Sequence, residues 1–376
     1  ISEKSKNLIQ KTTLKHIKHL CHEEVFSLNN HGIFQIQGLM ALLKVSGEDS
    51  NKEIISYALD KMESLVDSQF DNKGVHLEHS PLYHLFALHM FDRILMNDWY
   101  NKKPGIIDTL KIASEVSKWI VDPHKRPACI GDSILTKQEH VDFSVNDHAD
   151  DLEIETNDKK FVFSKFNESG YSIFRSNWDC NPEKATYFFF MGMYHSKIHK
   201  HRDCLSFEWL ENGDKLICDS GKYGYKSNEY RNFFLSNRAH NTVEIEGFDI
   251  IKLKKYSSAI QETIYEDGIF KLNSKLDYPA VKFNRNIYLK PEKWIIVNDN
   301  LDFKKSRLIK QWFHLNKDYG LESFDQNYFK FSNANNKIIV HCLNGECSPK
   351  FSYGDRGSMQ GFISEKDWHY TENCAL

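Results

Sequence analysis

Residues 205–219, LSFEWLENGDKLICD, hold the pattern that decides the fold. Apolar and aromatic residues alternate with polar ones on both sides of the turn cluster at 211–214, which predicts the strands Leu205–Glu211 and Lys215–Asp219. The same period of two recurs through the second half of the chain, and no helices alternate with these strands. We therefore predict antiparallel sheets stacked as a sandwich. The other predicted strands are Phe161–Phe166, Tyr171–Ser176, Tyr187–Met193, Thr242–Glu246, Asn286–Leu289, Trp294–Asn298, Arg307–Leu315 and Lys337–Cys342.

The first third of the chain has a helical period instead. Apolar residues recur every three to four positions in Asn51–Phe70, Ser80–Tyr100 and Ile107–Val121. Short loops between these segments indicate antiparallel helical hairpins. We predict a helical domain over residues 1–125, a connection over 126–158 and a β domain over 159–376.

Composition limits the classes of function. A chain of 376 residues suits two domains. A net charge of −3 argues against nucleic acid as the main partner, although a local basic cluster could still hold a smaller anion. No apolar run is long enough to span a bilayer. The eight cysteines form no CxxC pair, which supports neither a disulfide framework nor a zinc ribbon. The chain begins with Ile1, and we interpret it as a processed or truncated product whose signal peptide is not visible.

A histidine-rich stretch, residues 194–203, is the first chemical signal. If the segment is extended, His195, Lys197, His199 and His201 share one face. A solvated basic strand edge is the alternative interpretation.

A possible metal site joins this stretch to two others. Asp219 ends an apolar strand and is followed by Ser220 and Gly221, and His240 opens another strand. Together with His201 they supply two imidazoles and one carboxylate from three sheet elements. Such a set suits Zn²⁺ with a fourth position left open.

Two motifs in the helical half add further candidates: Asn29-Asn30-His31-Gly32, and the segment from Glu78 to His84 that contains Tyr83. Ser80-Pro81 supplies an N-cap and a first helical position for the helix that follows. Asn30 could equally be an N-cap, and Tyr83 an ordinary packing residue.

These motifs, taken in order, resemble the heparinase II/III-like polysaccharide lyases, which include heparinase III and oligoalginate lyases. The matching signatures are Asn30-His31-Gly32, Glu78-x-Ser80-Pro81-x-Tyr83-His84, Ile130-Gly131-Asp132-Ser133, His199-x-His201-x-Asp203-x-x-Ser206, Gly213 to Asp219-x-Gly221-x-Tyr223-x-Tyr225, Arg231, and Ala239-His240-Asn241-Thr242-Val243. Only about 28 residues precede the first signature. We therefore expect either that N-terminal helices were removed or lie in a separate piece, or that the chain is a shortened relative.

The resemblance implies an incomplete (α/α) toroid followed by an antiparallel multi-sheet β-sandwich, and a structural zinc. The implied metal ligands are His201, Asp219 and His240. The implied catalytic residues are Asn30, His31, Tyr83 and His199. Candidates for binding an acidic glycan are Glu78, His84, Lys197, Lys200, Arg231, Arg238 and Tyr225, with a surface role as the alternative for the cations. The resemblance also implies a periplasmic or secreted location.

The expected reaction is β-elimination at a uronate, which yields a 4,5-unsaturated product. The C5 proton is acidic only when the neighbouring carboxylate is neutralised by hydrogen bonds, for which Asn30, His31 and His199 have donors. Tyr83 is expected to transfer the proton, because neighbouring imidazoles could lower its pKa from about 10. Its role as acid or base, with His31 or His199 as partner, stays open.

Three other functions are compatible with the same residues. They are a zinc hydrolase with a metal-bound hydroxide, a glycoside hydrolase that pairs Glu78 with another acid, and a non-catalytic glycan-binding or cell-envelope assembly protein. Heparan-type chains, alginate and capsular uronates all fit as the glycan.

Overall fold

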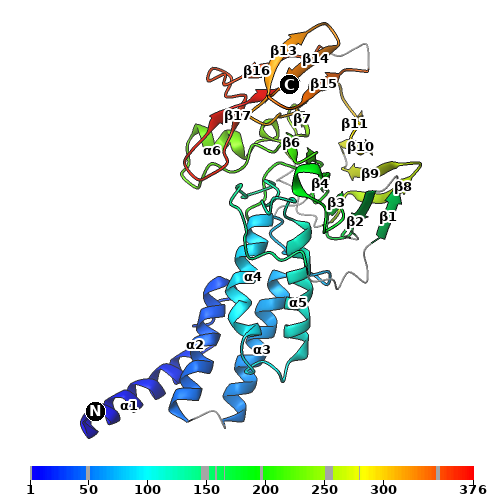
Figure 1. Ribbon diagram of the computed structural model, residues 1–376. Coiled ribbons are helices and arrows are strands. Elements are labelled where there is room, and N and C mark those ends of the chain that lie inside the picture. Colours follow the sequence, from blue (N-terminus) through cyan, green and yellow to red (C-terminus); the bar gives the residue numbers. More distant parts are fainter. Residues whose placement is uncertain are drawn as a thin grey trace. The chain divides into compact units, whose positions relative to one another are not determined.

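The computed structural model describes residues 2–47, 51–144, 152–156, 159–164, 166–194, 198–249, 257–278, 280–343 and 348–376 (Figure 1). The chain divides into two compact units. The helical unit comprises Ile1–Leu77 and His84–Val116, and the β unit comprises Glu78–Tyr83 and Ser117–Leu376. The short segment Glu78–Tyr83 therefore groups with the β unit, although the chain on both sides of it belongs to the helical unit.

The helical unit is built from amphipathic helices, and the helices predicted from periodicity are confirmed within a few residues. The elements are α1 (Glu3–Leu20), α2 (Asn30–Ser46), α3 (Lys52–Gln69), α4 (Pro81–Leu95) and α5 (Pro104–Trp119). Apolar side chains such as Leu39, Met62, Leu65, Phe91 and Leu110 form one buried core. Helix α1 packs on α2, and α2 packs on α3. In the described part of the chain, no helix is both long enough and apolar enough to cross a membrane.

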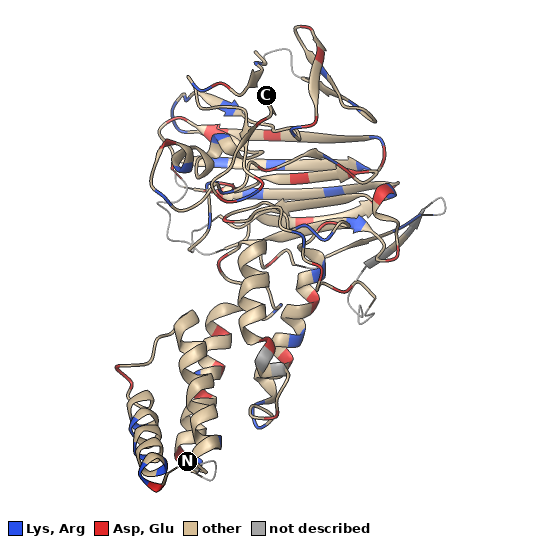
Figure 2. Cartoon of the chain, turned by 60° about the vertical axis from the view of Figure 1, so that its left-hand side comes forward, with Lys and Arg blue, Asp and Glu red and all other residues tan. Residues whose placement is uncertain are grey.

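The β unit contains two large antiparallel sheets, which confirms the predicted strand pairing. A six-stranded meander runs in the order β1 to β6, and a four-stranded sheet has the order β11-β10-β9-β8. Acidic and basic residues are interspersed along the strands (Figure 2). The large-sheet strands are β1 (Leu152–Thr156), β2 (Lys159–Phe163), β3 (Tyr171–Ser176), β4 (Tyr187–Met191), β5 (Phe207–Glu211), β6 (Asp214–Ile217), β8 (Ile260–Glu266), β9 (Ile269–Asp277), β10 (Val281–Lys290) and β11 (Trp294–Phe303).

Smaller sheets complete the β unit. Strand β7 pairs with β12, β13 to β15 form a three-stranded sheet, β16 pairs with β19, and β17 pairs with β18. A short helix, α6 (Glu229–Phe234), lies between β6 and β7 in sequence. The small-sheet strands are β7 (Val243–Ile245), β12 (Ile309–Gln311), β13 (Gly320–Phe324), β14 (Tyr328–Ser332), β15 (Lys337–His341), β16 (Ser352–Tyr353), β17 (Phe362–Ile363), β18 (Thr371–Glu372) and β19 (Cys374–Ala375).

The two large sheets share one aromatic core. Phe174 on β3 stacks on Phe270 of β9 with ring centroids 5.0 Å apart, and Phe188 on β4 lies 5.8 Å from the same ring. The opposite face of the meander is also covered. The Arg175 guanidinium donates to the carbonyl of Lys118 (2.7 Å), and the Tyr187 hydroxyl donates to that of Trp119 (2.9 Å). Every residue of β3 is consequently buried.

Strands β1, β8, β9, β13, β14 and β16 to β19 were not predicted, and β1 lies within the segment predicted to be a connection. The outward residues of β9 are mostly charged or polar, so its mean apolar content is low even though it alternates regularly between buried and exposed positions. A local signal was present at the turn between β8 and β9. Asp267 and Gly268 both have positive φ (54° and 76°), as a two-residue hairpin turn requires, and the Asp-Gly pair favours that turn.

Candidate active site

The segment before α4 is tied to the β unit through two serines. The hydroxyls of Ser80 and Ser133 are 3.0 Å apart, and Ser133 Oγ also accepts from the backbone N–H of Leu82 (3.1 Å). Ser80 Oγ accepts from the N–H of Tyr83 (3.4 Å), which is the contact of the predicted N-cap. These bonds position Tyr83 within the β unit.

Tyr83 lies directly against His199, which belongs to the histidine-rich stretch of residues 194–203. Its ring stacks on that of His199, with centroids 3.5 Å apart and an interplanar angle of 14°. Its hydroxyl is 2.6 Å from the hydroxyl of Tyr225, which is itself 3.4 Å from His199 Nδ1. The structure therefore brings together two residues expected to be catalytic and one expected to bind substrate.

A buried aspartate that was given no role in the sequence analysis links this group to the possible metal site. Asp132 Oδ2 accepts from His199 Nδ1 (2.8 Å), and its Oδ1 accepts from His201 Nε2 (2.8 Å) and Arg231 Nη2 (2.6 Å). Burial alone would raise the pKa of Asp132, but these hydrogen bonds and the guanidinium charge outweigh burial and hold the pKa well below its usual range. The group is thus a carboxylate that orients two imidazoles.

The backbone around Asp132 is fixed as firmly as its side chain. Its N–H donates to the carbonyl of His199 (2.9 Å), and the N–H of Gly131 donates to the carboxylate of Asp203 (2.8 Å). Gly131 has φ 61°, and a Cβ there would lie 2.7 Å from the His199 carbonyl oxygen, so this approach requires glycine. Lys200 forms an ion pair with Asp203 and is buried. Lys200 is therefore not available to bind an acidic sugar, contrary to expectation.

The partners of His199 define which of its nitrogens can react. Because Nδ1 faces the Asp132 carboxylate, it carries the proton in the neutral ring, and the lone pair is on Nε2. That nitrogen lies 3.6 Å from Glu78 Oε2. In the neutral ring Nε2 is therefore the basic nitrogen, and the carboxylate on Nδ1 sets the orientation of the ring.

The expectation that imidazoles lower the pKa of Tyr83 is wrong. Burial raises the pKa, the hydrogen bond with Tyr225 lowers it only in part, and the carboxylates of Asp132 and Glu78 raise it further. The sequence showed the histidines, but it showed neither the burial of the phenol nor that Asp132 and Glu78 lie near it. The Tyr83 phenol is accordingly protonated at neutral pH.

The residues expected to bind zinc lie next to the same aspartate. The rings of His201 and His240 are 5.3 Å apart, and both are fully buried. His201 Nδ1 and His240 Nε2 have no hydrogen-bond partner in the described part of the chain. The other nitrogen of each ring is bonded to a carboxylate: His201 to Asp132, and His240 Nδ1 to Asp219 Oδ2 (2.7 Å).

The donor chemistry of this pair fits a metal ion. Each unpaired nitrogen carries the ring's lone pair, and a carboxylate on the opposite nitrogen is the usual partner of a metal-binding histidine. No group of three His, Cys, Asp or Glu side chains is already arranged around one point within the described ranges. The Asp219 carboxylate is turned toward His240 and toward the N–H of Gly221 (3.0 Å).

The other candidates fall into separate environments. Arg231 is largely buried and engaged with Asp132, whereas Tyr225 is 50% exposed. Arg238 is half-buried, with its guanidinium over the ring of Phe233. Lys197 lies outside the described residues.

In the helical unit, Asn29 caps α2 by accepting from the N–H of His31 (2.9 Å), so the alternative of Asn30 as the N-cap is wrong. His31 is exposed and Asn30 half-buried. A Cβ at Gly32 would lie 2.0 Å from the Ser27 carbonyl oxygen, which explains the glycine of this motif.

His84, expected to bind substrate, is instead a buried residue of the helical core. Its Nε2 donates to the Ala113 carbonyl (2.9 Å), and its Nδ1 accepts from the N–H of His76 (3.3 Å). Both ring nitrogens are therefore used inside the unit. Burial lowers the pKa of His84 to about 4, and the bond to Ala113 offsets only part of that effect.

Because the folded pKa of His84 is below its unfolded value of about 6.5, its neutral form stabilises the fold above that value, and this contribution is lost as the pH falls towards 4. We expect about 2 kcal/mol of unfolding free energy to be lost between pH 7.5 and 5. Denaturant unfolding followed by helical circular dichroism measures this. The loss should shrink in His84→Gln and persist in His89→Gln, whose side chain is exposed. Equal pH dependence in all three proteins would contradict the assignment.

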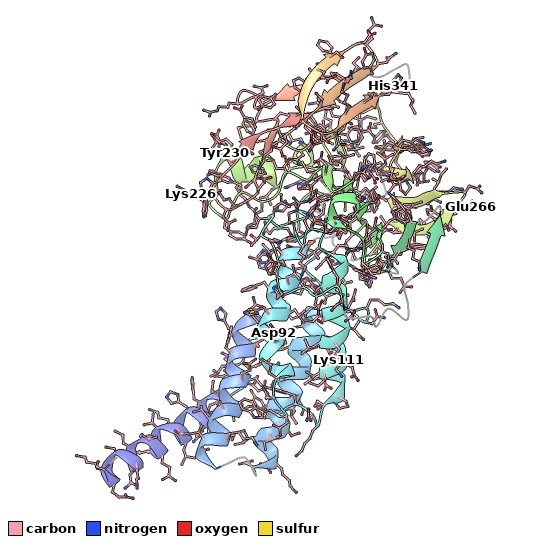
Figure 3. The ribbon with its side chains drawn as sticks, viewed as in Figure 1. Asp92, Lys111, Lys226, Tyr230, Glu266 and His341 are labelled. Carbon is pink, nitrogen blue, oxygen red and sulfur yellow. The ribbon has the colours of Figure 1, made fainter. Side chains whose placement is uncertain are left out.

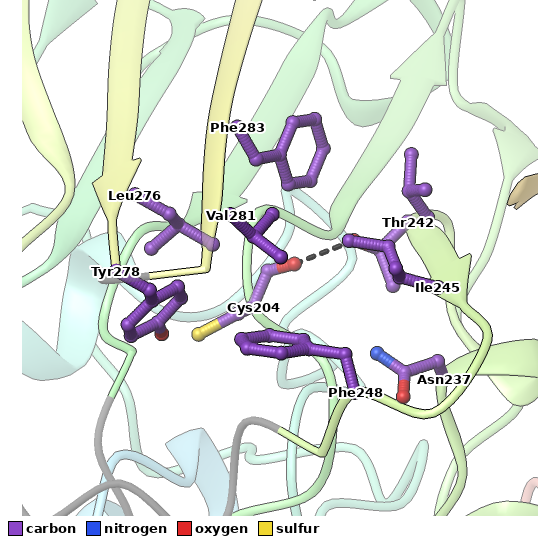
Figure 4. A pocket seen from close by; sticks show the side chains of 10 residues that line it. Cys204, Asn237, Thr242, Ile245, Phe248, Leu276, Tyr278, Val281 and Phe283 are labelled. Atoms are coloured by element: carbon purple, nitrogen blue, oxygen red, sulfur yellow. Dashed lines mark hydrogen bonds between the residues drawn. The ribbon is translucent and has the colours of Figure 1, made fainter. Parts of the chain in front are cut away.

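A separate pocket in the β unit is apolar. Cys204, Leu276, Tyr278, Val281 and Phe283 are among its lining residues, and Thr242 Oγ1 donates to the Cys204 carbonyl beside it (2.5 Å) (Figure 4). Neither Asp132 nor Tyr83, His199 or His201 lines this pocket. The candidate active site is therefore the set of polar residues around Asp132 and Tyr83, and not this pocket.

Comparisons with known proteins point to one family. The model of the heparinase II/III-like C-terminal domain matches residues 158–369, more than half of the chain. A heparin-sulfate lyase of Bacteroides stercoris is 23% identical over 270 residues, which are 65% of this chain and 39% of that protein.

Solved structures share the fold. The heparan sulfate lyase HepC of Pedobacter heparinus has a TM-score of 0.72 at 17% identity, covering 92% of this chain and 56% of its own. The heparinase III BT4657 gene product has a TM-score of 0.73 at 20% identity, covering 92% and 55%. The chain thus spans only part of the length of the relatives that it matches.

Proposed function

This chain belongs to the heparinase II/III-like family, and from that membership we propose that it acts as a polysaccharide lyase that cleaves a uronic-acid-containing glycan by β-elimination. The observation that carries the proposal is the stacked pair of Tyr83 and His199, with His199 oriented by Asp132. The name of the Bacteroides stercoris relative, a heparin-sulfate lyase, supports the same reaction class.

The proposed proton transfers follow from the two ring environments. Nε2 of His199 removes the C5 proton of the uronate, because its lone pair is free when Nδ1 faces Asp132. The electron pair left on C5 forms the C4–C5 double bond as the C4–O bond breaks. The Tyr83 hydroxyl donates its proton to the leaving glycosidic oxygen, since its raised pKa keeps it protonated. The Tyr225 hydroxyl stabilises the resulting phenolate by donating to it.

Neutralising the substrate carboxylate requires further donors. We assign this task to Asn30 and His31, an assignment that rests on the family resemblance alone. The same resemblance supports the proposals that the helices belong to an incomplete (α/α) toroid and that the protein works in the periplasm or outside the cell. Preorganised donors of this kind stabilise the developing dianion more than any other single effect.

Zinc is proposed as a structural ion bound through the unpaired nitrogens of His201 and His240. Asp219 is proposed as the third ligand, which requires its carboxylate to turn away from His240 Nδ1, the atom that it contacts in this structure. Zinc bound there would join the segments that carry these residues. Asp132, which contacts both His201 and His199, would transmit that order to the reacting histidine.

We expect His240→Ala to lose bound zinc and to lower Tm by about 5 to 15 °C, because the metal's binding energy is part of the folding energy. Metal analysis and calorimetry on the same samples measure both. His341→Ala is the control, since His341 is exposed on β15 (Figure 3). Wild-type protein that binds no zinc when supplied with it would overturn the assignment.

The reaction itself is tested by incubating the protein with heparan sulfate, alginate and other uronate polymers. Elimination produces ultraviolet absorbance from the 4,5-unsaturated uronate, whereas hydrolysis produces new reducing ends without it. Reducing ends without absorbance would replace the proposal by a hydrolase. Binding without either product would favour a glycan-binding role.

A further inference from the structure

An exposed tryptophan stands beside the active site in a constrained conformation. Trp368 is 52% exposed and has φ 64°, a left-handed conformation that costs a bulky residue of the order of 1 kcal/mol or more. The backbone N–H of Trp368 donates to the Tyr223 carbonyl (2.6 Å). The surroundings therefore impose this backbone geometry on a side chain that remains half in solvent.

A glycine makes room for the indole. A Cβ on Gly224 would lie 3.0 to 3.1 Å from three atoms of the Trp368 ring, and Gly224 itself has φ 145°. The ring of Tyr223 meets the indole edge to face, with centroids 5.8 Å apart. Tyr223 and Gly224 therefore both pack against the indole of Trp368.

This support connects Trp368 to the reacting residues. Gly224 immediately precedes Tyr225, whose hydroxyl is 2.6 Å from that of Tyr83. Lys222 and Asp367, which precede Tyr223 and Trp368 in the chain, form an ion pair (3.2 Å). All of these residues belong to the β unit, so the indole and the phenol pair are held by one framework.

The exposed residues that lie close in sequence to Trp368 and to Gly224 are mainly polar. Lys226 and Lys366 are exposed, and within the described ranges neither has an ion-pair partner. Lys226 lies at the same edge of the β unit as Tyr230 (Figure 3). Glu229 and His369 are exposed nearby in sequence. Trp368 and the half-exposed Tyr225 among such residues differ from the contiguous apolar patch that marks a protein-binding surface.

We propose that Trp368 is a sugar-binding subsite for the unit next to the one that is cleaved. The indole stacks on the C–H face of that sugar, and Lys226 and Lys366 attract its acidic groups. The subsite rests on the proposed lyase function for the identity of the glycan, but its binding role does not depend on catalysis.

The test uses heparan sulfate and alginate oligosaccharides of increasing length, with maltohexaose as a neutral control. Binding is measured by calorimetry on Tyr83→Phe protein, which leaves the ligand intact, and KM and kcat are measured on the active protein. We expect Trp368→Ala to raise Kd and KM about tenfold for long acidic chains, with little effect on the shortest substrate and on kcat. Trp368→Phe should restore part of the affinity.

Phe324→Ala is the matched control, since it removes another exposed aromatic ring, on β13. Lys226→Gln with Lys366→Gln should weaken binding mostly at low salt, which tests the charged half of the subsite without disturbing the indole. Unchanged Kd for long chains in a folded Trp368→Ala protein would overturn the proposal. Binding that depends on Trp368 without any unsaturated product would overturn the lyase function and leave the subsite standing.

Discussion

Tyr83→Phe is expected to lower kcat for elimination by about a hundred- to ten-thousandfold, the usual contribution of a positioned proton donor. The phenyl ring keeps its stacking on His199, and the Tyr225 hydroxyl is half exposed and can bond to water instead. Tm should therefore stay within about 2 °C of the wild type. The measurements are the ultraviolet absorbance of unsaturated product and calorimetric unfolding.

Tyr230→Phe is the matched control for this variant. The Tyr230 hydroxyl also pairs with another phenol, that of Tyr370 (3.0 Å), but neither ring touches His199 in the contacts described here. It should retain its turnover. Wild-type turnover in Tyr83→Phe would remove Tyr83 from the mechanism.

The same assignment predicts a pH dependence. An acid must be protonated to act, and burial raises the pKa of Tyr83 above its ordinary value of about 10. Loss of this proton therefore cannot reduce kcat below about pH 10, and any fall of kcat at lower pH must come from another group, so it should persist in a Tyr83 variant with residual activity when kcat is measured against pH. A rise of kcat with pH, centred near pH 8, that disappears in a Tyr83 variant with residual activity would show that the phenol ionises early and acts as the base.

Asp132→Asn is expected to lower kcat by about a hundred- to ten-thousandfold, because the amide no longer fixes His199 with its proton on Nδ1. KM should change much less than kcat, since Asp132 is buried and does not contact substrate. Asp132→Ala should also destabilise the fold by about 3 to 5 kcal/mol, because the Arg231 guanidinium would lose its buried partner.

Zinc content separates the two functions of this aspartate. Loss of an outer carboxylate typically weakens metal binding by about 10- to 100-fold, so Asp132→Asn should need more zinc for occupancy. If excess zinc restores both occupancy and kcat, Asp132 acts only through the metal site, and its direct role on His199 is wrong. Asp249→Asn, which removes a carboxylate bonded to Arg202 in the same unit, should affect neither property.

The sequence predicted most of the strands and helices whose apolar residues recur with a clear period, because that period alone identifies them. It missed β8, and also β9 although the burial of β9 is one-sided, because polar residues make up much of both strands. It also missed Asp132, which lies in an irregular connection 67 residues before His199. Only the Gly131-Asp132-Ser133 motif indicated it, since no periodicity relates residues that meet through tertiary structure. The raised pKa of Tyr83 comes first from burial, which the sequence does not show, and to a smaller extent from that same unpredicted carboxylate.

The double use of Asp132 has a consequence for interpreting diverged copies of this protein. One oxygen faces the reacting imidazole and the other faces a core imidazole and a guanidinium, so selection for a folded core alone is enough to preserve the residue. A descendant that has abandoned chemistry should keep Asp132 and lose Tyr83 first. Inherited activity is therefore better judged from the phenol than from the aspartate.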